Sequence, residues 1–222
     1  MSDAPVISVR GEAVLEADAE IAELTVTVQS KDHDRRAALD QLVTRNRACL
    51  ELVRSYGDAV EKVETGALTI TPVLKYRRRE GDIHYYQGTV WVRVTVVDFA
   101  VLGELITRLG DQDRTRVDGP RWALRRDSEV YTRAARQAVG QAVERARGYA
   151  DALGCRLTGL VELSDEGLGS QGAEPFDAVP VAYGASAAME MDGEPESISL
   201  EPATQTVRAA VEARFTASPP DL

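Results

Sequence analysis

Basic and aromatic side chains gather in one short stretch of the sequence and could bind an anion by combining charge with ring stacking. They are Lys75, Tyr76, Arg77, Arg78, Arg79, His84, Tyr85 and Tyr86. Proteins that bind single-stranded nucleic acid use this combination, because cationic groups follow the phosphates while bases stack on aromatic rings. The simpler interpretation is a solvated hairpin tip whose charges keep a sheet edge from aggregating. One short basic run in an acidic protein leaves a weak electrostatic footprint, so the sequence favours this second interpretation.

A second motif, at residues 167–172, fits the glycine pattern G-x-G-x-x-G of dinucleotide-binding proteins. In those proteins the motif opens a helix whose N-terminal amides bind the pyrophosphate. Here Pro175 and Pro180 follow, which excludes a helix, and Glu174 and Asp177 add negative charge. We therefore interpret the motif as part of a loop and expect no nucleotide cofactor.

The residue types that most often carry catalysis or bind metals are few and scattered. His33 and His84 have no further His or Cys at ligand spacing, so no zinc site is expected. Cys49 and Cys155 stand where small apolar residues are expected, and we predict buried, reduced thiols rather than a disulfide. Ser170 lacks the sequence surroundings of a catalytic nucleophile. The sequence therefore predicts a protein without enzymatic activity, cofactor or metal.

Composition limits the class of protein. The chain has 222 residues, enough for one substantial core or two small packed subdomains, and 44% of them are hydrophobic. Lys plus Arg number 26 against 36 for Asp plus Glu, and the net charge of -10 disfavours non-specific binding to nucleic acid or anionic lipid. Neither a secretory signal nor a membrane span is recognisable, so we expect a cytoplasmic protein.

Negative charge is concentrated in residues 157–207, a stretch with ten acidic residues and no Lys or Arg. Within it, residues 167–201 combine three prolines with several glycines and most of these acidic residues. Prolines and glycines interrupt both helices and strands, so we predict a long acidic loop over residues 167–201.

Hydrophobic periodicity predicts the elements that must position these residues. Alternating apolar residues predict strands at about 6–16, 20–30, 60–76, 83–97, 117–125, 157–163 and 207–215. Helices are expected to begin at Asp32 or Asp34, after a cap at Asp98, and after Asp127 or Ser128. The last helix carries an alanine-rich stripe, and small side chains let it lie close against a sheet or another helix.

The predicted strands at 60–76 and 83–97 form a hairpin, and its loop at residues 77–82 carries the three arginines. A tight turn near residues 17–18 joins the first two strands. Trp91 falls on the polar phase of its strand, opposite the valines. It therefore either packs beneath a helix or marks an interface, because an exposed Trp is unusual on a lone monomer.

Several stretches of the chain together resemble the SIMPL domain family, a bacterial group of unknown function that includes periplasmic immunogenic proteins. The matching stretches are residues 7–12, the strand through Val28 with the helix after it, and residues 66–72, 89–97, 135–163 and 206–215. The part at 146–154 is the most distinctive. The resemblance covers nearly the whole chain and contains no catalytic signature. It implies an α+β fold with antiparallel or mixed sheets, built from repeated strand-helix-strand-strand units packed with the long alanine-rich helix. It also implies frequent self-association and a link to stress or envelope physiology, and many relatives carry an export signal.

These observations lead to two functional hypotheses for a single domain over residues 1–218, with halves of about 1–97 and 98–218. The first is a non-enzymatic structural or interaction protein that forms a homo-oligomer through strand edges, the hairpin tip and the acidic loop, with Trp91 at an interface. The second is a binding module in which Arg77, Arg78, Arg79 and the two tyrosines hold an anionic ligand or single-stranded nucleic acid. The first hypothesis is the leading one because the sequence has no catalytic constellation, an outward Trp91 and oppositely charged peripheral segments. The net charge makes nucleic acid an unfavoured partner.

Overall fold

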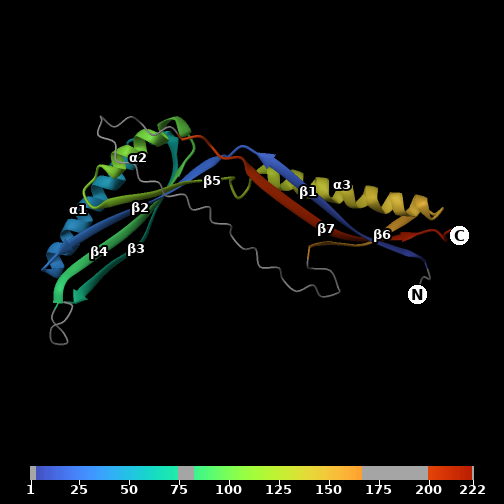
Figure 1. Ribbon diagram of the computed structural model, residues 1–222, viewed down its shortest axis with the longest axis horizontal. Coiled ribbons are helices and arrows are strands. Elements are labelled where there is room, and N and C mark those ends of the chain that lie inside the picture. Colours follow the sequence, from blue (N-terminus) through green and yellow to red (C-terminus); the bar gives the residue numbers. More distant parts are fainter. Residues whose placement is uncertain (1–3, 75–82, 167–199, 222) are drawn as a thin grey trace, which may run out of the picture. The chain divides into compact units, whose positions relative to one another are not determined.

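The computed structural model describes residues 4–74, 83–166 and 200–221 (Figure 1). The strands are β1 (Val6–Ala17), β2 (Ile21–Asp32), β3 (Val60–Leu74), β4 (Ile83–Val96), β5 (Thr115–Ala123), β6 (Leu157–Asp165) and β7 (Gln205–Ala217). The α-helices are α1 (Arg35–Arg54), α2 (Leu102–Gly110) and α3 (Glu129–Ala152), with short 3-10 helices η1 (Gly57–Ala59) and η2 (Phe99–Val101). Among the described residues the strands form two antiparallel sheets, which confirms the predicted α+β class.

One compact unit contains β2 to β5, α1 and α2, within residues 18–125 and 191–203 as far as these are described. Its four-stranded sheet has the order β3-β4-β2-β5, and all neighbouring strands are antiparallel. The chain order β2-α1-β3-β4-α2-β5 with this strand order is the split βαβ, ferredoxin-like arrangement. In it, each helix connects two strands that are not neighbours in the sheet.

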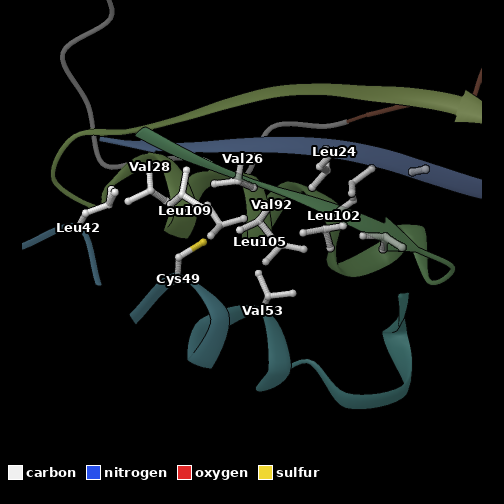
Figure 2. Close-up of a cluster of buried hydrophobic side chains, with 14 residues drawn as sticks. Leu24, Val26, Val28, Leu42, Cys49, Val53, Val92, Leu102, Leu105 and Leu109 are labelled. Atoms are coloured by element: carbon white, nitrogen blue, oxygen red, sulfur yellow. The ribbon is translucent and has the colours of Figure 1, made fainter. Parts of the chain in front are cut away.

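The core of this unit lies between one face of the sheet and the two helices, and Figure 2 shows its side chains converging. Alternate residues of β2 and β4 point inwards, as the predicted valine alternation requires, and they meet residues at helical spacing from α1 and α2. The buried set is Ala22, Leu24, Val26, Val28, Leu42, Cys49, Val53, Val90, Val92, Val94, Val96, Leu102, Leu105 and Leu109. Each Val or Leu removed from water in this way stabilises the fold by about 1.5–3 kcal/mol before chain entropy is counted.

The second unit contains β1, α3, β6 and β7, within residues 1–17, 126–190 and 204–222 as far as these are described. The three strands have the order β1-β7-β6, and α3 lies over β1 and β7 while it barely contacts β6. Its buried stripe is Ala134, Ala138, Ala142, Ala146 and Ala150. A Cβ on Gly11 of β1 would clash with the carbonyl oxygen of Ala138 and lie 2.6 Å from the amide nitrogen of Ala142. Helix and strand backbones therefore touch, which confirms the predicted close approach of this helix.

The two units repeat one topology. The repeats are β2-α1-β3-β4 and β1-α3-β6-β7. In each, the strand before the helix pairs with the last strand of the repeat. The strand directly after the helix, β3 or β6, lies at the edge of the sheet. This confirms the expected strand-helix-strand-strand repeats, but the repeats interleave along the chain. The units therefore do not coincide with the expected halves 1–97 and 98–218, because β1 pairs with β7 and shares a core with α3. The turn after β1 leads into the other sheet and does not close a hairpin.

The predicted helix starts are observed, and each is capped by a side chain. Oδ1 of Asp34 accepts a hydrogen bond from the amide of Ala37 at 2.8 Å, Asp98 caps η2, and Ser128 caps α3. Caps of this kind stabilise a helix by about 1 kcal/mol. Cys49 and Cys155 are buried free thiols, as predicted.

Candidate interaction surfaces

The described chain contains part of the predicted basic and aromatic cluster. Residues 75–79, with all three arginines, lie outside the described residues, so the expected anion site stays a prediction. His84, Tyr85 and Tyr86 lie at the beginning of β4, and Tyr86 pairs with Asp32 of β2. The strand pairing therefore places these aromatic residues beside the end of β2.

Two side chains outside the predicted cluster, those of Lys31 and His33, complete this end of the sheet. The ammonium of Lys31 lies 3.8 Å from the ring centroid of Tyr85, a cation–π contact worth about 0.5–1 kcal/mol at an exposed site. The rings of His84 and Tyr85 lie edge to face at 5.1 Å, and Nδ1 of His33 is 2.8 Å from the carbonyl oxygen of His84. β2 extends to Asp32, two residues beyond the predicted end of the second strand at residue 30, and so brings Lys31 and the following His33 beside β4.

Trp91 lies on the outer face of the four-stranded sheet and is 40% exposed. It pairs with Thr27 of β2, while its neighbours Val90 and Val92 point into the core. The indole covers Gly66 of β3, where a Cβ would lie 2.6 Å from the Cδ2 atom of the ring. An aromatic ring over a strand glycine shields the sheet backbone. Trp91 therefore lies on the outer face of the sheet rather than beneath a helix, and it remains a candidate contact residue.

A groove of about 500 Å³ runs between α3 and β6, and we call it the β6 groove. Its apolar lining is Val143, Ala150, Leu157, Leu160 and Phe215. Leu160 and Leu163 pair with the buried Phe215 and Ala213, so they point to the helix side of the sheet. They are nevertheless 58% and 46% exposed, because α3 covers β1 and β7 and leaves β6 uncovered.

The other repeat has a groove at the equivalent place, between α1 and β3, and we call it the β3 groove. Its volume is about 670 Å³, and Leu39, Leu68 and Ile70 form its apolar lining beside Arg35 and Arg36. Leu68 pairs with the buried Val90 and so faces the helix side, yet it is 48% exposed. Both repeats thus expose aliphatic side chains on the helix side of the strand that follows the helix, which is β6 in one repeat and β3 in the other.

The free strand edges carry features that disfavour pairing with another strand. On β1, the amide of Glu12 donates to Oε1 of Gln141 at 2.6 Å, and Arg145 donates to the carbonyl oxygen of Arg10 at 2.6 Å. These α3 side chains occupy backbone groups that an added strand would need. The register of β6 shifts twice against β7, and that of β3 shifts three times against β4, while β5 contains Pro120.

The titratable groups within the described residues form no cluster of the kind that holds a metal ion. In residues 4–74, 83–166 and 200–221, no three His, Cys, Asp or Glu side chains lie close enough together to hold a metal. Burial raises the pKa of the Cys49 thiol to about 11, so it is protonated and unreactive at neutral pH. Burial also raises the pKa of the Tyr56 hydroxyl, which donates to Glu104 at 3.0 Å and accepts from Arg108 at 3.2 Å.

Other predicted features lie outside the described residues. They include the glycine motif at 167–172, Ser170 and nearly all of the expected acidic loop at 167–201, so the predictions for them stay predictions. Leu200, at the end of that stretch, packs against the core of the four-stranded unit. None of the described helices combines the length and apolar character needed to cross a membrane.

Comparisons with known proteins support the resemblance noted in the sequence. The sequence profile of the SIMPL family, a protein of unknown function (DUF541), matches residues 7–215. No curated protein sequence matches the chain. A crystal structure of a proposed amidohydrolase/peptidase from Burkholderia cenocepacia is similar over 61% of this chain, at 14% identity and a TM-score of 0.29. This chain spans 34% of that protein, and a likeness at that TM-score carries no argument about fold or activity.

Proposed function

The chain belongs to the SIMPL family of proteins of unknown function (DUF541), and we propose that it is a non-enzymatic structural or interaction protein that assembles with copies of itself. The observation that carries the proposal is the uncovered helix side of β6, where Leu160 and Leu163 stand exposed beside a groove. Exposed apolar patches rimmed by polar residues mark interaction sites. Full burial of a Leu side chain contributes about 1.5–3 kcal/mol, so the exposed half of each of these two leaves about 1 kcal/mol to be gained on contact.

A second copy of the chain is the proposed occupant because every copy carries two grooves of similar composition. Each groove combines aliphatic side chains with charges of both signs. The charged residues are Arg147, Asp151 and Arg156 in the β6 groove and Asp34, Arg35, Arg36 and Asp40 in the β3 groove. The β6 groove of one copy can therefore bury its leucines against the β3 groove of another while arginines face aspartates. The guarded strand edges direct the proposed contact to these grooves rather than to strand addition.

The test is the absolute mass in solution, measured by light scattering after size exclusion over a range of protein concentrations. The double variant Leu160→Gln and Leu163→Gln is expected to dissociate the assembly, because it removes the apolar side chains of the proposed contact. The single chain should still fold, since both side chains are exposed and contribute little to its stability. Val14→Thr is the matched control, because Val14 is equally exposed but lies on β1, away from the groove. A monodisperse monomer at high wild-type concentration would refute the proposal.

Ionic strength separates two versions of the proposed contact. An oligomer whose mass stays constant between low and high salt assigns the contact to the leucines of the grooves, because apolar burial is not screened. Dissociation at high salt assigns it instead to charged contacts, such as those of the hairpin tip and the acidic loop that the sequence suggested. Fractionation of cells tests the accompanying proposal of a cytoplasmic location.

A second candidate function is a binding module at the hairpin for an anionic ligand or single-stranded nucleic acid. The observation that favours it is Lys31, which adds a cation beside the rings of Tyr85 and His84. Fluorescence anisotropy with a labelled single-stranded oligonucleotide tests it. Binding should weaken with salt and vanish when Arg77, Arg78 and Arg79 are changed together to Glu. Unchanged affinity in that variant would remove the idea.

A further inference from the structure

The chain contains two histidines, and the fold brings them together. His33 directly follows the last residue of β2, and His84 is the second residue of β4, 51 positions later. Their ring centroids lie 6.2 Å apart with the rings inclined at 60°. Both side chains are exposed, so an ion in solution can reach them. Spacing along the sequence had excluded a metal site, whereas the pairing of β2 with β4 creates the juxtaposition.

A hydrogen bond selects the form of His33 that binds metals. Nδ1 of His33 lies 2.8 Å from the carbonyl oxygen of His84. A carbonyl oxygen only accepts hydrogen bonds, so Nδ1 carries the proton and Nε2 keeps its lone pair. Histidine ligands in proteins are commonly held in this way, with one ring nitrogen donating to a carbonyl while the other binds the metal. The bond also ties one ring to the backbone of the other histidine.

We propose that His33 and His84 together bind one divalent transition metal ion, such as Zn²⁺, through ring nitrogens, with water completing the coordination. A Zn–N bond of about 2.0–2.1 Å places a ring centroid roughly 3.2 Å from the ion, so two rings on one ion lie about 5.2 Å apart at the tetrahedral angle and about 6.4 Å apart when they stand opposite each other. The observed 6.2 Å exceeds the tetrahedral spacing by about 1 Å, which a small rotation of the exposed His84 side chain closes. Imidazole ligands select Zn²⁺, Cu²⁺ and Ni²⁺ over Mg²⁺ and Ca²⁺, which prefer oxygen.

The backbone around His33 is held by neighbouring side chains. Asp32 accepts from the amide of Asp34 at 3.0 Å and from Nε2 of Gln41 at 2.8 Å, which fixes the residues on both sides of His33. Both carboxylate oxygens of Asp32 are used in these bonds, and Lys31 rests over the ring of Tyr85. Among the residues that the structure describes, the site therefore offers two protein ligands on a fixed backbone, and water completes the coordination of an ion that exchanges with solution.

Isothermal titration of the tag-free full chain with Zn²⁺ tests the proposal, with Mg²⁺ as the control ion. One Zn²⁺ per chain is expected to bind, and His33→Asn and His84→Asn should each weaken binding at least about ten-fold. Mg²⁺ should produce no binding heat. Asp58→Asn, which removes an exposed carboxylate in η1, should leave Zn²⁺ binding unchanged. The two histidine substitutions together leave a chain without any imidazole, so binding that depends on imidazole must disappear.

Two outcomes overturn the proposal. One is Zn²⁺ binding that both single variants retain at wild-type affinity, which would place the ion elsewhere. The other is a wild-type chain that shows no binding at about 1 mM Zn²⁺. Circular dichroism checks that each variant is folded. Should either variant fail to fold, NMR of the wild-type imidazole nitrogens decides, because Zn²⁺ must shift both ring systems and a metal bound elsewhere leaves them unchanged.

Discussion

Replacing Gly11 by Ala tests the claim that the backbones of β1 and α3 are in direct contact. The added Cβ would lie 2.6 Å from the amide nitrogen of Ala142 and 2.8 Å from its Cβ, where ordinary contact begins at 3.4 Å. The helix must therefore move by more than about 0.8 Å (3.4 minus 2.6) away from the strand, because the carbonyl oxygen of Ala138 would lie closer still to the added Cβ. Helix backbone cannot rotate out of the way as a flexible side chain can, so the whole packing of the alanine stripe is disturbed.

The expected loss of stability follows from two contributions. Overpacking a core of this kind costs about 1–3 kcal/mol. The same movement stretches the 2.6 Å hydrogen bonds that Gln141 and Arg145 make with β1, each worth about 0.5–1.5 kcal/mol. Since both bonds are exposed to water, their lower values apply, and the Gly11→Ala variant should lose about 2–4 kcal/mol.

Urea denaturation measures this loss as a change in the free energy of unfolding, followed by circular dichroism for each resolved transition. Gly140→Ala in the same helix is the matched control, because no described atom beyond its chain neighbours and its own helix backbone lies within 4 Å of its added Cβ. That control should gain about 0.5–1 kcal/mol, as alanine is the better helix former. A Gly11→Ala variant that loses less than about 0.5 kcal/mol would show that α3 does not rest on the strand backbone.

Two further predictions concern the buried thiol and the guarded edge of β1. Folding raises the pKa of Cys49 from 9.0 to about 11, so its contribution to stability is complete below pH 9 and is lost as the pH rises towards 11. Urea titrations should show that the wild type loses free energy of unfolding between pH 8 and pH 10.5. In Cys49→Ala this loss should be smaller by about 2 kcal/mol, and an equal loss in both proteins would contradict the assignment. Changing Gln141 and Arg145 together to Ala frees the amide of Glu12 and the carbonyl of Arg10, so thioflavin T fluorescence and scattered mass should rise through edge pairing. Changing Gln137 and Glu144 to Ala, on the same helix, should leave both signals unchanged; equal behaviour of the two double variants would refute the guarding role.

The proposed assembly and the proposed metal site depend on different side chains and can fail separately. Assembly depends on the leucines of β6 and on the β3 groove, whereas the metal site depends on His33 and His84. A chain that binds Zn²⁺ yet remains monomeric would remove only the first proposal. Measuring the mass with and without Zn²⁺ therefore shows whether the two properties are connected.

The sequence by itself determined the elements and the family, because these depend on local patterns. The alternation through Val90 and Val96 produces a strand with one buried face, and the caps at Asp34, Asp98 and Ser128 mark helix starts. Such signals involve residues a few positions apart, so the local sequence is enough to recognise them. The α+β class follows from the number and order of these elements, and the many weak positions along the chain identified the SIMPL family.

Only the tertiary structure decided which elements become neighbours. The pairing of β1 with β7, nearly 200 positions later, separates β1 from the strand that follows it and interleaves the two repeats. The same kind of long-range pairing brings His33 to His84, and the position of α3 over β1 leaves Leu160 exposed. An alternating pattern states that a strand has a buried face, but many partners and registers satisfy it equally well. The choice among them depends on the total packing of the folded chain, which no local spacing encodes.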